Sequence, residues 1–523
     1  MLNKNAYKIL RHGVIILAVS LVPHFLLAAD IPPTISFSVS AFNVIGENPL
    51  DSKLTQKTLA PFLGQHEGLE ALLEAAAELE SAILQAGHSF HRVILPPQTM
   101  DTGSVQLEVL VFTLANIEVT GNTRFSNENI IASLPGLKPG TVPDTKELSR
   151  ELIVANDHPS KQVTIRMKHS KSPNSVDAEL AVKDQRPWQF FSGLNNIGND
   201  ETGDFRLTGG FQHTNLLDLD DSLTISYTTS PGHFSDVKQY GANYRLPLYA
   251  LSSNLSFYYS RSDVNSGTIE QVFDVSGAGK FLGGSFTHTF RNKENYRHRI
   301  SVGVDDKLFE NNIGFQGIPL GVDVRSRPLT LSYSGEWRFE KAGLNYQINY
   351  VRNMRGGRSN NNQTYAAARF GATKSWEAFR FSMAGSYALP KGWSATAILS
   401  GQYTNEPLIS GEQFGLGGAN SVRGFQERGV TGDKGVRFTL EAWTPPLKYD
   451  IRLLGFMDGG HTKNLETPVG QVGSDTIVSL GVGARWRWSD KLSVNLDYAH
   501  QIDDALTPNA GGARAHLNIF YRF

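Results

Sequence analysis

Apolar and polar residues alternate with a period of two through the C-terminal part of the chain. Residues 329–333, 344–350 and 492–498 each place their apolar side chains on one face of an extended strand and their polar side chains on the other. A period of two is the repeat of a β-strand whose two faces meet different surroundings. The pattern recurs over residues 186–523, with turns between the segments, so we predict an antiparallel sheet of many strands there.

The length of this region and its aromatic residues favour a membrane barrel over a soluble sandwich, although sandwiches also contain alternating strands. Trp486 and Trp488 lie on the apolar face near a strand end, where membrane barrels carry aromatic residues at the lipid boundary. Every backbone group in lipid must be hydrogen-bonded, and a closed sheet achieves this without helices. We therefore predict a transmembrane antiparallel β-barrel for residues 186–523.

The N-terminus has the features of a secretory signal peptide. Three basic residues precede an apolar run over residues 13–27, and the small residues Ala28 and Ala29 follow it. A membrane anchor is the alternative, but Pro23 interrupts a run that is already shorter than the ~20 residues of a spanning helix. We predict that residues 1–29 are removed on export, which leaves the periplasm or the outer membrane as the destination.

The strand count can be estimated from the alternating segments. About seventeen candidates are present, whereas single-chain bacterial barrels have an even number of strands. Residues 363–373 follow three asparagines and are rich in alanine, so we assign them to an outside loop and expect about sixteen strands. If both ends of the barrel lie in the periplasm, residues 405–434 form a long loop that starts on the outside.

Residues 35–185 mix helical and strand patterns. Leu69, Leu72, Leu73, Ala76, Leu79 and Ile83 recur at spacings of three and four, as in an amphipathic helix, and Gly87 is a suitable stop. Residues 44–50 and 119–125 share Val, Gly and an apolar residue at matching offsets. We predict two small β-α-α-β-β modules, at residues 35–113 and 114–185.

The composition argues against several classes of function. The chain has 49 Lys+Arg and 50 Asp+Glu residues, so no charge excess indicates a nucleic-acid partner. It has no cysteine, which excludes disulfides, thiol nucleophiles and cysteine-bound zinc. The 14 histidines have no metal-ligand spacing, and no Gly-x-Ser-x-Gly elbow occurs. We expect no enzyme activity, no cofactor and no metal.

Two short segments partly resemble ligand-binding motifs, but we do not predict that either binds a ligand. Residues 277–280 contain Gly-Ala-Gly-Lys, but the residues around them do not fit a phosphate loop, and we expect a strand there. Asp218, Asp220 and Asp221 suggest a calcium site. We expect instead a solvated acidic cluster in a periplasmic turn.

The long loop and a strand that follows it carry two motifs of a known superfamily. Residues 422–425 read Val422-Arg423-Gly424-Phe425, and Phe456, Asp458 and Gly460 form a Phe-x-Asp-x-Gly pattern. Together they resemble the signature of the Omp85 superfamily. Two modules before a barrel of about sixteen strands resemble its two-partner secretion transporters, the haemolysin-activator type, whose modules are called POTRA domains.

The resemblance implies a role for each motif. Arg423 would descend into the barrel on its loop and pair with Asp458, which would lock the loop inside. The period of two independently places Phe456 and Asp458 towards the lumen, where an arginine fork can meet the carboxylate. Glu441, on the lumen face of its own strand, is either a second partner or part of a generally polar lumen. Phe523 ends the last strand and would be part of the signal read by the barrel assembly machinery.

The resemblance also implies a function. The POTRA-type modules would capture an unfolded secreted exoprotein, an adhesin or a haemolysin-like protein, and the barrel would pass it through the outer membrane, surrounded by lipid. Two alternatives remain open: a factor of the same superfamily that inserts other barrels, and a passive diffusion porin. Cleavage near Ala29 would leave too few residues for the N-terminal plug helix that some of these transporters have.

Overall fold

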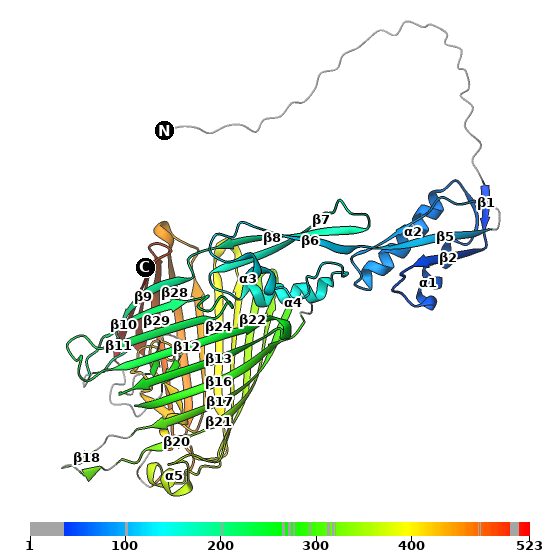
Figure 1. Cartoon of the computed structure of the whole chain (residues 1–523). Helices are drawn as coiled ribbons and strands as arrows, with labels where there is room; N and C mark the ends of the chain where they lie inside the picture. The colour runs from blue at the N-terminus through cyan, green and yellow to red at the C-terminus, as the bar shows by residue number, and fades with distance from the viewer. Residues whose placement is uncertain are drawn as a thin grey trace, which may run out of the picture. The chain divides into compact units, whose positions relative to one another are not determined.

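The computed structural model shows small α+β modules and a closed barrel (Figure 1). The predicted signal peptide at residues 1–29 lies outside the described part of the chain. The described residues are 36–99, 103–199, 202–263, 267–269, 273–275, 278–291, 293, 295–310, 314–315, 318–319, 321–468, 470, 472–502 and 512–523.

The first module has a three-stranded sheet in the order β2-β5-β4, with β2 and β5 parallel, and a ribbon of β1 and β3. Leu72, Leu79 and Ile83 of the long helix are fully buried, as the helical period predicts. Leu69 and Leu73 are exposed, however: Leu69 precedes the helix and Leu73 lies off the buried stripe. The elements are β1 (Ser36–Val39), β2 (Ala41–Gly46), α1 (Ser52–Leu59), η1 (Ala60–Phe62), β3 (Gly64–Glu67), α2 (Glu70–Gln85), β4 (His91–Ile94) and β5 (Ser104–Val111).

The second module repeats the order β2-α1-α2-β4-β5 of the first, without counterparts of β1 and β3. Its sheet runs β6-β8-β7, with β6 and β8 parallel and β7 and β8 antiparallel. Ser126 caps the first helix and Asp144 caps the second, through their side-chain oxygens. The predicted β-α-α-β-β order is therefore present twice. The elements are β6 (Thr113–Thr120), α3 (Asn127–Ala132), α4 (Thr145–Asn156), β7 (Lys161–His169) and β8 (Ser175–Asp184).

The barrel is a closed antiparallel sheet, which the figure shows as strands side by side around a lumen (Figure 1). Outward positions are apolar and exposed, and lumen positions are polar or small, as the period of two predicts. The segments are β9 (Trp188–Asn195), β10 (Arg206–His213), β11 (Ser222–Thr229), β12 (Gln239–Leu248), β13 (Ser253–Ser262), β16 (Gly279–Thr289), β17 (Tyr296–Phe309), β20 (Val324–Ser326), β21 (Pro328–Arg338), β22 (Ala342–Asn353), β23 (Glu377–Ala388), β24 (Ser394–Tyr403), β27 (Lys434–Trp443), β28 (Ile451–Lys463), β29 (Ser474–Arg487), β30 (Leu492–Gln501) and β31 (Ala513–Arg522).

These segments make sixteen strands, because β20 and β21 are one strand interrupted at Arg327. Both pair with β17 and keep one register, with Lys307 opposite Ser326 and Val304 opposite Leu329. The predicted count is therefore confirmed. The barrel closes where β31 pairs with β9, and Phe523 extends this seam by donating its N–H to the Phe190 carbonyl at 2.9 Å.

Shorter elements occupy the connections. The segment predicted as an outside loop holds the short helix α5 (Asn362–Ala368) between β22 and β23. The remaining elements are η2 (Tyr249–Leu251), β14 (Gly267–Ile269), β15 (Phe273–Val275), β18 (Gly314–Phe315), β19 (Ile318–Pro319), η3 (Pro390–Gly392), η4 (Ser410–Glu412), β25 (Phe414–Leu416), β26 (Val430–Gly432) and η5 (Lys448–Asp450).

The second module docks on the turn between β10 and β11 through buried polar residues. Lys161 of β7 forms an ion pair with Asp220, and the Tyr249 hydroxyl donates to the same carboxylate at 2.6 Å. His158 lies 3.9 Å from Asp220 and bonds the Thr214 carbonyl at 2.5 Å. Burial lowers the pKa of both His158 and Lys161, although Asp220 opposes this, and burial and Asp220 raise the pKa of Tyr249.

The expectation of a solvated acidic cluster at this turn is therefore wrong for two of its three members. Asp220 is 3% exposed and Asp221 is fully buried, while Asp218 keeps an exposed hydrogen bond to Ser126. The second module covers the turn, and its Lys161 supplies the opposite charge that a buried carboxylate requires. The sequence alone does not show that this turn is covered.

Candidate functional site

The loop between β24 and β27, residues 404–433, folds back onto the barrel wall and has a small core of its own. We call it the inward loop. Its strands β25 and β26 pair with each other, from Phe414 opposite Gly432 to Leu416 opposite Val430. Its buried apolar residues pack together with Ile477 of β29, a strand of the wall; they are Leu416, Val422, Phe425 and Val430.

Glycines and small residues of the wall make room for the loop. A Cβ on Gly460 would lie 2.7 Å from the Leu416 side chain, and a Cβ on Gly435 would lie 2.3 Å from Phe414. Either side chain would therefore collide with the inward loop where it now sits. Gly460 of the strand motif thus has a steric reason to be glycine.

Arg423, near the tip of the loop, forms a bidentate salt bridge with Asp458 of β28. Its Nε donates to Asp458 Oδ2 at 2.7 Å, and its Nη2 donates to Oδ1 at 3.0 Å. The backbone N–H of Arg423 also donates to Oδ2, at 3.1 Å. Arg423 is 4% exposed and Asp458 is fully buried. A fork-to-carboxylate contact of this kind fixes orientation as well as distance.

Three more residues surround the guanidinium. Glu441 Oε1 lies 3.0 Å from Arg423 Nη2, and Asp497 Oδ1 lies 3.6 Å from Nη1. The guanidinium carbon lies over the Phe456 ring, 3.4 Å from the ring centroid. Glu441 is thus a direct partner and not merely one polar residue of the lumen.

The acids of the site outnumber Arg423, and other groups balance them. Asp497 also accepts two hydrogen bonds from Arg485, each at 2.8 Å. The Trp443 indole donates to Glu441 Oε2 at 3.0 Å. Asp458 is thus paired with Arg423 itself, while Glu441 and Asp497 each have a further donor, so the charges are compensated although the site is largely closed to solvent.

Gly424, the next residue of the loop motif, is held by its backbone. Its N–H donates to His516 Nε2 at 3.0 Å, and its carbonyl accepts from Gln501 Nε2 at 2.6 Å. Its φ of +95° lies in the left-handed region that favours glycine. A Cβ at this position would lie 3.2 Å from the Ala499 Cβ. The loop tip therefore touches β30 and β31 as well as β28.

Three polar side chains that contact Arg423 or Gly424 were not predicted from the sequence: Asp497, Gln501 and His516. The alternation along residues 492–498 does place Asp497 on the polar face with other lumen residues. That alternation shows which face a residue occupies but not whether the loop reaches it.

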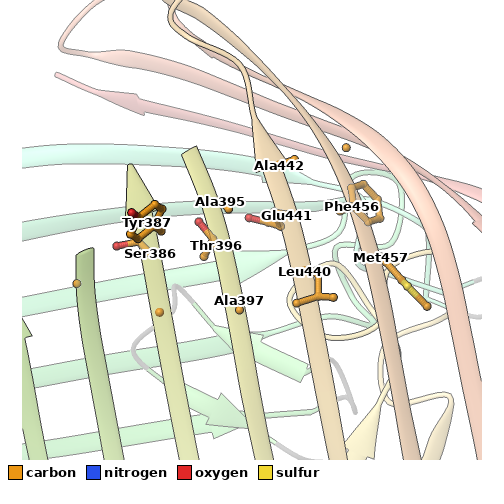
Figure 2. A pocket seen from close by; sticks show the side chains of 13 residues that line it. Ser386, Tyr387, Ala395, Thr396, Ala397, Leu440, Glu441, Ala442, Phe456 and Met457 are labelled. Atoms are coloured by element: carbon orange, nitrogen blue, oxygen red, sulfur yellow. The ribbon is translucent and has the colours of Figure 1, made fainter. Parts of the chain in front are cut away.

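Glu441 and Phe456 lie on the adjacent strands β27 and β28, as Figure 2 shows. They line a hollow of about 540 Å³, which is also lined by Ala397, Ala442 and Gly455.

None of the helices in the described residues is both long and apolar enough to cross a membrane. In the same residues, no group of three or more His, Cys, Asp or Glu side chains is arranged to hold a metal ion.

Comparison with known proteins identifies relatives over nearly the whole described chain. Residues 175–486, more than half of the chain, match the model of haemolysin secretion/activation protein ShlB/FhaC/HecB, and residues 37–111 match the POTRA domain of ShlB type. The outer membrane transporter CdiB of Dickeya dadantii (strain 3937) is 25% identical over 458 residues, which cover 82% of this chain and 77% of the relative.

Two further relatives extend the comparison. The heme/hemopexin transporter protein HuxB of Haemophilus influenzae (strain 86-028NP) is 20% identical over 459 residues, covering 85% of this chain and 80% of the relative. The solved structure of CdiB from Escherichia coli matches with a TM-score of 0.75 at 18% identity and covers 96% of this chain and 93% of that one. The structural match shows that the two chains share a fold.

Proposed function

Because the chain belongs to the haemolysin secretion/activation protein family ShlB/FhaC/HecB, we propose that it secretes one exoprotein, captured unfolded in the periplasm, through its barrel. It is an outer-membrane transporter with POTRA-type modules on the periplasmic side. We assign residues 1–29 to the signal peptide, 35–113 and 114–185 to the modules, and 186–523 to the barrel. The cargo is an adhesin or a haemolysin-like protein.

Capture takes place at the sheet edges of the modules. In the described residues, β2 and β4 flank the sheet of the first module, and β6 and β7 flank that of the second. An unfolded segment can add to such an edge as a further strand, because the contact uses backbone hydrogen bonds. This mode requires no particular side chain from the cargo, so it suits an exoprotein that arrives unfolded.

Passage requires the inward loop to move. Its tip contacts β28, β30 and β31, and Arg423 holds it there through Asp458 and Glu441. We propose that this contact is a lock that keeps the pore closed until cargo arrives. Folding of the cargo outside the cell then supplies the direction of transport, because refolding there prevents its return.

The proposal that Arg423 locks the loop rests on one observation, the buried bidentate salt bridge between Arg423 and Asp458. Its test is Arg423→Ala, compared with Arg358→Ala on an exposed part of an outer loop. Arg423→Ala should leave the amount of folded barrel unchanged. Because the unanchored loop no longer takes the docked position from which cargo displaces it, one protein that the wild type releases should disappear from the culture medium. Normal secretion by a well-inserted Arg423→Ala protein would contradict the lock.

The same cells also separate this proposal from its two alternatives. If the protein inserted other barrels, its inactivation would lower the amounts of several outer-membrane proteins together. If it were a passive porin, its inactivation would reduce the uptake of small solutes. Loss of a single secreted protein, restored by the wild-type gene, is the result that we expect.

A further inference from the structure

The inward loop touches the barrel wall at a second charged site, at Glu412, eleven residues before Arg423. Glu412 of η4 lies on the limb that enters the loop, and its side chain is 1% exposed. Its Oε2 accepts a hydrogen bond from Arg380 Nη2 of β23 at 2.9 Å, and its Oε1 lies 3.4 Å from Lys307 Nζ of β17. One buried carboxylate is thus held by two wall cations.

Backbone contacts reinforce this site. The Glu412 carbonyl accepts from Arg380 Nη2 at 3.2 Å and from Gln402 Nε2 of β24 at 3.1 Å. A Cβ on Gly411 would lie 2.1 Å from the Phe309 ring of β17, so the loop backbone approaches the wall as closely as a glycine permits. Glu412 and its neighbour therefore connect the loop to β17, β23 and β24, whereas Arg423 connects it to β27, β28 and β30.

The base of the loop is bonded mainly to neighbouring outer loops. Gln402 of β24 links the base to the Glu412 site, because its Nε2 donates to the carbonyls of both Asp433, at 2.9 Å, and Glu412, at 3.1 Å. At the base, Asp433 pairs with Arg369, and it accepts the N–H of Leu408 at 2.8 Å and that of Leu465 at 2.7 Å. These bonds join the two ends of the loop to neighbouring outer loops. The base is therefore fixed to the outer mouth, while Glu412 and Arg423 hold the part that enters the barrel.

A space separates the loop from the wall between the two inner contacts. A cavity of about 490 Å³ lies there, lined by Gln347, Asn349 and Ser382 of the wall and by Asn420 and Ser421 of the loop, among others. Glu412 and Arg380 also line it. The loop is thus not packed against β22 and β23 along its length, and its closed position there depends on the Glu412 contact.

We propose that Glu412, with Arg380 and Lys307, is a second positioning site that holds the inward loop in the closed pore. This inference rests on the proposed function, in which the loop closes the pore. Burying a carboxylate is unfavourable unless it is paired, and removing one partner of a buried pair is strongly destabilising. Loss of the Glu412 charge should therefore release this limb of the loop even while the Arg423 contact is intact.

The test is the ion conductance of the purified full-length protein in planar lipid bilayers, which needs no cargo. Glu412→Gln should increase the fraction of time that the pore is open about tenfold, as the loss of about 1.4 kcal/mol of closed-state preference would. Glu406→Gln is the matched control, because Glu406 lies on the same loop but bonds Thr404 close by, at 3.0 Å. It should conduct like the wild type.

A charge exchange distinguishes positioning from a general effect on folding. Arg380→Glu combined with Glu412→Arg restores an ion pair of opposite orientation. The pore of this double variant should therefore be open for a smaller fraction of the time than that of Arg380→Glu or Glu412→Arg alone. If Glu412→Gln fails to insert, Arg380→Gln and Lys307→Gln test the same contact from the partly exposed wall side, and both should open the pore.

The outcomes separate this proposal from the lock at Arg423. If Arg423→Ala opens the pore but Glu412→Gln conducts like Glu406→Gln, the second positioning site is wrong and the lock stands. If neither variant opens the pore, the loop does not close it and both proposals fail. Opening by both variants, with closure on charge exchange, supports the second site.

Discussion

Replacing Asp458 with Asn should release the tip of the inward loop. Asp458 accepts three hydrogen bonds from Arg423, at 2.7, 3.0 and 3.1 Å, and has no exposed surface. The asparagine amide retains one acceptor oxygen and turns an N–H group towards a guanidinium that can only donate. Breaking a buried pair by removing one charge costs about 3–5 kcal/mol.

The lower end of that range applies here, because Glu441 and Asp497 still face the guanidinium at 3.0 and 3.6 Å. A loss of about 3 kcal/mol shifts the balance between docked and released loop by about 100-fold. The shift should appear as a change in the population of the released loop and not as loss of the barrel, whose sheet does not depend on this contact.

The released population can be measured with a single thiol. The chain has no cysteine, so Val422→Cys introduces the only one, at a position that is fully buried while the loop is docked. A membrane-impermeant maleimide added from outside reacts only when the loop opens, so its rate follows the open population. Asp458→Asn should accelerate labelling about 100-fold. Asp490→Asn, in an exposed turn, is the control. A change of less than about threefold would refute the reasoning.

Three further predictions follow from the same contacts. Phe456→Leu removes the ring 3.4 Å from the guanidinium and should accelerate the labelling of Val422→Cys about tenfold. An effect as large as that of Asp458→Asn would contradict the expectation that Asp458 holds the loop more strongly than Phe456 does. Deleting Phe523, which donates to Phe190 at the seam, should lower the amount of inserted barrel several-fold without altering the conductance of the inserted fraction; unchanged insertion would argue against an assembly signal. Acidification from about pH 7.5 to about pH 5.5 should loosen the second module from the barrel, seen as faster proteolysis within residues 114–185. Burial lowers the pKa of His158, despite Asp220 and with Lys161 and Arg245 nearby, so the undocked state binds more protons as the pH falls through the usual histidine pKa; His158→Gln should abolish the dependence.

Much of the fold could be predicted because its signals are local. The period of two identifies the barrel strands, and the same period places Asp458 on the lumen face of β28. The repeated Val and Gly positions near residues 44 and 119 indicate the two modules. The contact between Arg423 and Asp458 was expected from a family resemblance and not from the alternation.

The remaining features depend on contacts that no local pattern encodes. Asp220 is buried because the second module covers its turn, and its partner Lys161 is 59 residues away. Asp497 and His516 meet the loop only because the curvature of the barrel brings β30 and β31 to its tip. Glu412 is an ordinary loop acid in the sequence, and its two cations come from strands that are not neighbours in the sheet.

The central claim is that the loop must leave its closed position for cargo to pass, and a reversible cross-link tests it most directly. A Cβ on Gly424 would lie 3.2 Å from the Ala499 Cβ, near the separation of about 3.8 Å found in disulfides, so Gly424→Cys with Ala499→Cys should form one. The reduced double variant controls for strain at Gly424, whose φ is +95°. The oxidised protein should retain the exoprotein in the periplasm, and a reductant should restore its release; secretion at the wild-type rate with the disulfide intact would contradict the account.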